Sequence, residues 1–220
     1  MPTRLANEIE RDWGAVKPLA SPGTRALRLL PLGVVLLVAS PLYWGWRSNL
    51  GQLSPWISWG LSAVEVLAGV AILLAAFCEA IPGRELSRRW LILLLTASAV
   101  LFVAVTLGTH SALPNVAPQG SEVRYVWECV GMAALFSVPA LVVPTWLVAR
   151  ALPGRPALTG ALCGLGVGLM EDSGVRLFCW VTEPAHVLLS HGTAIVLLMM
   201  LGAASATIVE AVRSASRVHR

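Results

Sequence analysis

The sequence contains few charged residues. Only 13% of its 220 residues are Asp, Glu, Lys or Arg, whereas 56% are hydrophobic. A soluble domain averages roughly a quarter charged residues, so this chain has too little polar surface to face water on all sides. Its mean hydropathy of +0.74 agrees with that interpretation. The composition therefore argues against an ordinary soluble domain and indicates an integral membrane protein.

The sequence also lacks the motifs that identify common enzyme classes. It has no HExxH metalloprotease motif, no Walker loop, no GxSxG elbow and no glycine-rich dinucleotide fingerprint. It also lacks a convincing internal repeat of the kind found in many transporters. We therefore expect neither an enzymatic activity nor a cofactor.

Long apolar runs make up most of the chain. A transmembrane helix needs about 20 mostly apolar residues. A backbone that crosses hydrocarbon must satisfy its own N–H and C=O groups, which a helix does. The runs predict an all-α, polytopic bundle of six transmembrane helices, separated by loops rich in Pro and Gly. The expected spans are Ala26–Trp46, Ile57–Ile81, Arg89–Thr109, Trp127–Ala149, Ala157–Val175 and Pro184–Val212.

Basic residues are unequally divided between the two sides of these spans. The side that holds the N-terminus carries thirteen of the sixteen Lys and Arg residues, and the other side carries Arg47, Arg124 and Arg176. Because cytoplasmic loops are enriched in Lys and Arg, we predict that both ends are cytoplasmic. The expected parts are a leader with a short amphipathic helix (1–25), the six-helix membrane domain (26–212) and a short basic tail (213–220).

The leader has an apolar stripe. Leu5, Ile9 and Trp13 recur at i, i+4 and i+8, which places them on one face of a helix. Such a helix could rest on membrane lipid, or it could dock in a groove of a cytoplasmic partner. Three acidic residues in the same segment favour docking, because anionic lipid would repel them.

Two cysteines are expected on the outer side of the membrane. Cys129 lies in the fourth span near its outer end, and Cys179 follows the fifth span. Thiols on the outer side of the membrane can be oxidised, because that compartment is not kept reducing. The pair could form a disulfide, or it could act as a redox- or metal-responsive thiol pair to which nearby Glu128, Glu183 and His186 add ligands. It could also be two unrelated buried thiols. His186 and His191 are five residues apart, or about 140° around a helix, which predicts a poor two-ligand metal site.

Glu65 lies inside the second expected span. A carboxylate within hydrocarbon is costly and marks a functional site by default, although a hydrogen bond to a neighbouring helix is the simpler role. An alternative function therefore stays open, in which a small transporter or ion-pathway protein uses Glu65. Gly160, Gly164 and Gly168 recur every four residues in the fifth span and predict close helix packing.

Residues spread over the whole chain resemble those of one known family, the NrsF-type negative regulators of sigma F. The similar positions are the phrase Ala15–Pro22 with Arg25, Ile81–Arg84, Cys129, Arg150 with Pro156, Gly160, Gly164, Gly168, Cys179-Trp180 and His191-Gly192. One departure is that Glu171, Asp172 and Arg176 make the end of the fifth span more charged than the family pattern suggests.

The resemblance implies a six-span anti-sigma factor of the bacterial inner membrane. Its N-terminal segment would hold an extracytoplasmic-function sigma factor inactive, with Leu5, Ile9 and Trp13 in the binding surface and no direct contact with nucleic acid. Cys129 and Cys179 would be the pair that senses heavy-metal or oxidative stress, with a heavy-metal ion as a candidate ligand. These roles are expectations that follow from the resemblance.

Overall fold

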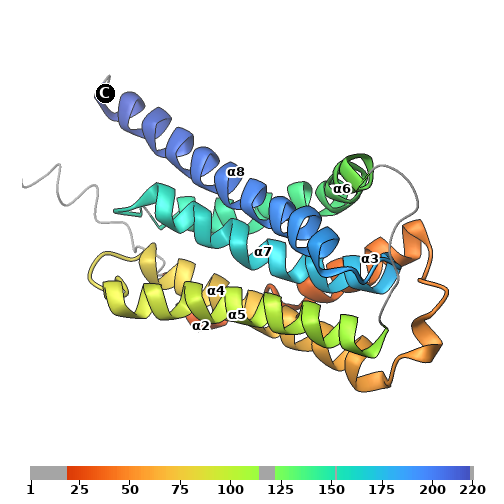
Figure 1. Ribbon diagram of the computed structural model, residues 1–220. Helices are drawn as coiled ribbons and strands as arrows, with labels where there is room; N and C mark the ends of the chain where they lie inside the picture. Colours follow the sequence, from red (N-terminus) through yellow and green to blue (C-terminus); the bar gives the residue numbers. More distant parts are fainter. Residues whose placement is uncertain (1–18, 114–121, 152, 219–220) are drawn as a thin grey trace, which may run out of the picture.

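The computed structural model describes residues 19–113, 122–151 and 153–218, and these contain helices and no strand (Figure 1). The all-α fold class is confirmed. The leader residues Leu5, Ile9 and Trp13 lie outside the described residues. The helices are α2 (Pro22–Leu27), α3 (Leu30–Trp44), the short turns η1 (Leu50–Gln52) and η2 (Trp56–Gly60), α4 (Leu61–Glu79), α5 (Arg88–Ala112), α6 (Glu122–Ala149), α7 (Pro156–Phe178) and α8 (Pro184–Val218).

Five helical stretches in the described part of the chain are long and apolar enough to cross a membrane, as expected for a membrane protein. They are Pro22–Trp44, Trp56–Glu79, Arg88–Ala112, Arg124–Ala149 and Pro184–Ser216. Helix α7 forms where the fifth span is expected, but it is not among the five, because its glycines and acidic residues lower its hydropathy. The count of six crossings and the cytoplasmic position of both ends therefore stay predictions.

Helix α7 lies at the centre of the bundle. Every residue from 162 to 177 is buried, and the helix packs against α3, α4, α6 and α8 (Figure 1). A helix enclosed by other helices does not need a surface compatible with lipid, so its polar side chains can turn toward protein partners. This position explains how α7 can hold Glu171, Asp172 and Arg176 inside an apolar bundle.

Glycines allow α7 to approach its neighbours closely. A Cβ atom on Gly164 would lie 2.2 Å from the carbonyl oxygen of Leu198 in α8, and one on Gly160 would lie 2.1 Å from a carbonyl oxygen of the same helix. On α4, a Cβ on Gly69 would lie 2.6 Å from the carbonyl oxygen of Gly166. The structure thus agrees with the close packing that the spacing of small residues predicts.

Helix α8 is longer than one crossing requires. Its 35 residues correspond to about 52 Å at 1.5 Å per residue, against a hydrocarbon core of about 30 Å. Its C-terminal end projects past the N-terminal end of α7 (Figure 1). The expected basic tail therefore begins within a helix that continues to Val218.

Candidate functional site

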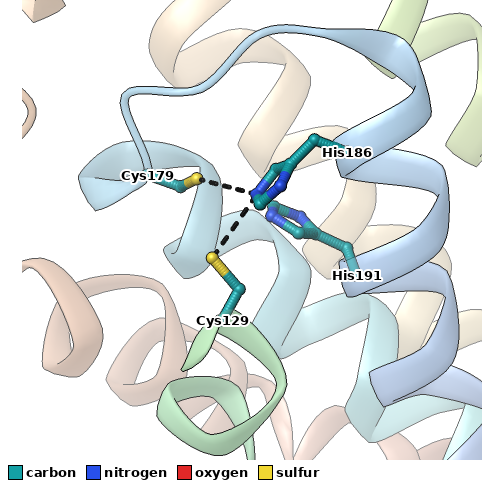
Figure 2. Close-up of side chains that lie close together, drawn as sticks. All are labelled: Cys129, Cys179, His186 and His191. Atoms are coloured by element: carbon teal, nitrogen blue, oxygen red, sulfur yellow. Dashed lines mark hydrogen bonds between the residues drawn. The ribbon is translucent and has the colours of Figure 1, made fainter. Parts of the chain in front are cut away.

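Two cysteines and two histidines meet where α6, α7 and α8 come together (Figure 2). Cys129 lies near the start of α6, Cys179 directly follows α7, and His186 and His191 belong to the first turns of α8. The four ligand atoms all lie within 4.8 Å of one another. Cys129 is partly exposed, and the other three side chains are buried. The structure thus brings together the two cysteines that the sequence singled out.

His186 is placed between the two sulfurs. Its Nε2 lies 3.5 Å from Sγ of Cys129 and 4.0 Å from Sγ of Cys179 (Figure 2). The backbone N–H of His186 donates to the carboxylate of Glu183 at 2.8 Å, which satisfies one free donor at the start of α8. Both cysteines are free thiols in this structure.

The histidines converge although their spacing predicts otherwise. Five residues place them about 140° apart around α8, yet their ring centroids are 6.3 Å apart and both rings are directed toward the sulfurs (Figure 2). The sulfurs approach from α6 and from the end of α7, so the meeting point lies beside the start of α8 and within reach of both imidazoles. The prediction that His186 and His191 make a poor ligand pair is therefore wrong in its geometry.

The surroundings of Cys179, which lies in the loop after α7, favour its thiolate. The Cys129 thiol and the imidazoles of His186 and His191 hold the pKa of Cys179 well below its usual value, against the opposing effect of burial. The thiolate is the form that binds metals and attacks oxidants. The cluster therefore has the chemistry of a metal-binding or redox-sensitive thiol site.

Asp172 holds the opposite side of the His191 ring. Its Oδ1 lies 2.6 Å from Nδ1 of His191, and its Oδ2 accepts a hydrogen bond from Nε of Arg176 at 2.8 Å. All three side chains are buried. Nε2 of His191 is buried and makes no hydrogen bond within the described part of the chain. One nitrogen of the ring is thus fixed by a carboxylate, and the other is available to a ligand.

Arg176 extends this network into the bundle. Its Nε lies 3.2 Å from the carboxylate of Glu65 on α4, and its Nη2 donates to Oγ1 of Thr106 on α5 at 3.1 Å. The structure therefore gives Glu65, the carboxylate that the sequence places within the second expected span, an ionic partner. This ion pair between α4 and α7 gives Glu65 a structural role, and it weakens the argument that Glu65 belongs to an ion pathway.

Helix α3 and the segment after it hold the same end of α7. Oγ of Ser40 donates to the carboxylate of Glu171 at 2.6 Å. The backbone N–H of Arg47 donates to the carbonyl oxygen of Leu177 at 3.1 Å. The guanidinium of Arg47 donates to the backbone carbonyl oxygen of Arg176 at 3.3 Å. These bonds satisfy carbonyl groups that the last turn of a helix leaves free. The end of α7 that leads to Cys179 is thus tied to α3 and to the segment that follows it.

A cavity of about 240 Å³ lies beside the cluster. Cys129, Cys179 and His186 line it, together with the exposed side chains of Trp44 and Trp180. Because exposed residues form part of its wall, the cavity offers a small ion or oxidant an approach from the surface to the sulfurs.

Sequence reasoning identified Cys129, Cys179 and Glu65, but it did not assign Asp172 and Arg176 to the same site. Their spacing of four residues in an otherwise apolar segment was the available signal, since residues i and i+4 of a helix face each other. The leader residues Leu5, Ile9 and Trp13 lie outside the described residues.

Comparison with known proteins agrees with the resemblance seen in the sequence. The family model described as NrsF, negative regulator of sigma F, matches residues 10–209. No curated protein and no solved structure matches the chain. The matched stretch includes Cys129, Cys179, His186 and His191, and also Glu65.

Proposed function

Since this chain belongs to the NrsF family, the negative regulators of sigma F, we propose that it is a non-enzymatic, multi-pass anti-sigma factor of the bacterial inner membrane. It sequesters an extracytoplasmic-function sigma factor through its N-terminal segment. It releases that factor when Cys129 and Cys179 meet a heavy-metal ion or an oxidant. The observation that carries the sensing role is the convergence of these thiols, fifty residues apart in sequence, on one partly exposed site with two imidazoles.

The location of the cysteines suits a sensor that moves helices. Cys129 belongs to α6, and Cys179 lies in the connection between α7 and α8. A new bond between them, or a metal ion held by both, changes how α6 meets the α7–α8 connection. A signal shifts a conformational equilibrium only through its different affinities for the two states, and a site shared by separate helices provides that difference.

Two contacts lead from the cluster toward the leader. The end of α7 is bonded to α3 through Ser40 and Glu171. Helix α6 begins near Cys129 and, close to its other end, the carbonyl oxygen of Leu147 accepts a hydrogen bond from the guanidinium of Arg25. Because the leader ends within α2, and α3 follows α2 directly, movement of α6 or α7 changes the support from which the leader reaches its partner.

The sigma-binding role is assigned to the leader stripe of Leu5, Ile9 and Trp13 on its sequence pattern. An amphipathic segment binds by placing apolar side chains at i, i+4 and i+8 in a groove. The polar side of the same segment is then turned away from the partner. This distinction provides a matched pair of variants.

Affinity capture of the cognate sigma factor tests the sequestering role. We expect the full chain to capture it, and a chain without residues 1–18, which keeps the described α2, to lose capture. Ile9→Asp should weaken capture at least tenfold, whereas Asn7→Asp, which adds the same charge outside the stripe, should change it less than twofold. Equal capture by the Ile9→Asp variant and the unaltered chain would refute the binding role of the stripe.

The sensing role is tested with Cys129→Ser/Cys179→Ser. This double variant should still capture the sigma factor but should no longer release it on addition of Cd²⁺ or peroxide. Cys78→Ser, which changes a thiol far from the cluster in sequence and outside it, should release it normally. If the double variant releases the sigma factor at the same ion and oxidant concentrations as the unaltered chain, the cysteine pair is not the sensor.

A further inference from the structure

We propose that Cys129, Cys179, His186 and His191 form one four-coordinate site for a thiophilic divalent cation of the Zn²⁺ or Cd²⁺ type, and that Asp172 is the positioning residue of this site. The inference rests on the proposed function, which requires only the two thiols. It adds two histidine ligands, a coordination number and a carboxylate that orients one ligand.

The distances fit a tetrahedral ion after a small contraction. With Zn–S of about 2.3 Å and Zn–N of about 2.0–2.1 Å, neighbouring ligand atoms of a tetrahedron lie about 3.3–3.8 Å apart. Nε2 of His186 and Sγ of Cys129 are already 3.5 Å apart, and no pair of the four ligand atoms exceeds 4.8 Å. Movements of about 1 Å therefore complete the geometry, which side-chain rotation can supply.

The donor set selects the class of cation. Two thiolates and two imidazoles favour Zn²⁺ and softer ions over Mg²⁺ or Ca²⁺, which prefer oxygen ligands. Two thiolates also neutralise a divalent cation, so the loaded site carries no net charge. That balance matters here, because three of the four ligand side chains are buried and an uncompensated buried charge is costly.

Asp172 completes an arrangement common around bound metals. A histidine ligand almost always donates its second ring N–H to a carboxylate, a backbone carbonyl or a water, which fixes the orientation of the ring. Asp172 already accepts from Nδ1 of His191 at 2.6 Å, which leaves Nε2 for the ion. Arg176 in turn holds the second carboxylate oxygen at 2.8 Å, so Asp172 cannot turn away from His191 without losing an ion pair.

An ion can reach the site through a cavity, and its binding moves the helices that carry the ligands. Cys129, Cys179 and His186 line the cavity of about 240 Å³ that reaches the exposed Trp44 and Trp180. An ion that contracts the cluster draws the start of α6 toward the start of α8. Since His191 is bonded to Asp172, the same movement acts on α7 and on its ion pair with Glu65.

The test uses the purified full-length protein in detergent, with Co²⁺ as a spectroscopic probe. We expect one Co²⁺ per chain, with the visible absorption of a tetrahedral ion and a thiolate charge-transfer band. Zn²⁺ or Cd²⁺ should displace it. Cys129→Ser, His186→Ala and His191→Ala should each weaken binding at least a hundredfold, and Cys78→Ser should leave it unchanged.

Asp172→Asn tests the positioning role. It should retain a thiolate-bound Co²⁺ spectrum but weaken affinity about 10- to 100-fold, and Asp172→Glu, which keeps the carboxylate, should recover part of that loss. The proposal is overturned if both single histidine variants bind Co²⁺ as the unaltered chain does, or if the spectrum is that of a six-coordinate ion. Thermal unfolding of each metal-free variant separates a lost ligand from a lost fold.

Addition of the sigma factor to the same samples separates this inference from the proposed function. If Co²⁺ or Cd²⁺ binds the four residues but the sigma factor stays bound, the site stands and the sensing function fails. If release depends on the cysteines while the histidine variants keep full metal affinity, the sensing function stands and the four-ligand site fails.

Discussion

The guanidinium of Arg176 lies 3.2 Å from the carboxylate of Glu65 and thereby joins α7 to α4 in the interior of the bundle. Both side chains are buried, Glu65 completely. Arg176 also holds Asp172, so one cation compensates two carboxylates. Removing the cation is therefore more costly than removing either acid, because a buried charge that loses its partner keeps its desolvation penalty.

We accordingly predict that Arg176→Met lowers the free energy of unfolding by about 3–5 kcal/mol, the cost of breaking a buried ion pair from one side. Glu65→Gln should cost less, since Arg176 keeps Asp172 as its partner. Unfolding of the purified protein in detergent measures both. Equal stability of Arg176→Met and the unaltered chain would show that the network contributes nothing to the fold.

The second prediction concerns the contact between α7 and α8. Gly164→Ala places a Cβ atom 2.2 Å from the carbonyl oxygen of Leu198, so the helices must separate, at a cost of about 1–3 kcal/mol. Gly131→Ala on α6 is the matched control, because a Cβ there meets nothing within 4 Å. Alanine favours a helix over glycine by about 1 kcal/mol, so this control should be neutral or stabilising in the same unfolding measurement.

The same pair of variants bears on the site. If α7 and α8 separate, Cys179 moves relative to His186 and His191, and Co²⁺ affinity should fall in Gly164→Ala but not in Gly131→Ala. A Gly164→Ala variant that is fully stable and binds Co²⁺ normally would contradict the close packing of the two helices.

The helices themselves were largely predictable from hydropathy, because long apolar runs must either be buried in the protein or cross a membrane. The expected span Arg89–Thr109 corresponds to α5 (Arg88–Ala112), and Ala157–Val175 corresponds to α7 (Pro156–Phe178). The first expected span is instead divided into α2 and α3 near Leu29, just before Pro31. Proline suits the first turn of a helix, but hydropathy does not register this local break.

The candidate site was predictable only in part. The sequence shows which side chains could bind a metal or react, but it does not show which of them meet in the folded bundle. The cysteines stood out by residue type and expected side. His191 was discounted, since helical spacing relative to His186 ignores ligands that arrive from α6 and from the end of α7. The pairing of Arg176 with Glu65 depended on which faces of α4 and α7 meet, and no pattern within either helix determines that.

The third prediction tests the direction in which the first four expected spans cross the membrane. Gly51, in the short turn η1, and Gly154, between α6 and α7, are exposed positions where an added Cβ atom meets nothing within 4 Å. In a chain without its other cysteines, Gly51→Cys should react in intact spheroplasts with a thiol reagent that cannot cross membranes. Gly154→Cys should react only after the membrane is opened. Labelling of both from outside would overturn the predicted topology.

The last prediction concerns Arg25, which anchors the base of the leader. Its buried guanidinium donates to the carbonyl oxygen of Leu147 in α6 and lies 4.4 Å from the ring centroid of Phe77 in α4. Hydrogen bonds to charged groups contribute about 1.5–3 kcal/mol, and 1.4 kcal/mol corresponds to a tenfold change in affinity. Arg25→Gln removes this hydrogen bond, so it should weaken sigma capture by about tenfold or more.

Arg28→Gln provides the control for this variant. Arg28 is exposed and lies one turn from Arg25, so its replacement removes the same charge without removing the anchor. It should leave capture within about twofold of the unaltered chain, as surface changes usually shift stability by no more than about 0.5 kcal/mol. Arg25→Gln should also bind Co²⁺ normally, because the metal ligands lie at the opposite end of α6. If Arg25→Gln weakens metal binding and capture together, Arg25 supports the whole bundle and does not act as an anchor for the leader alone.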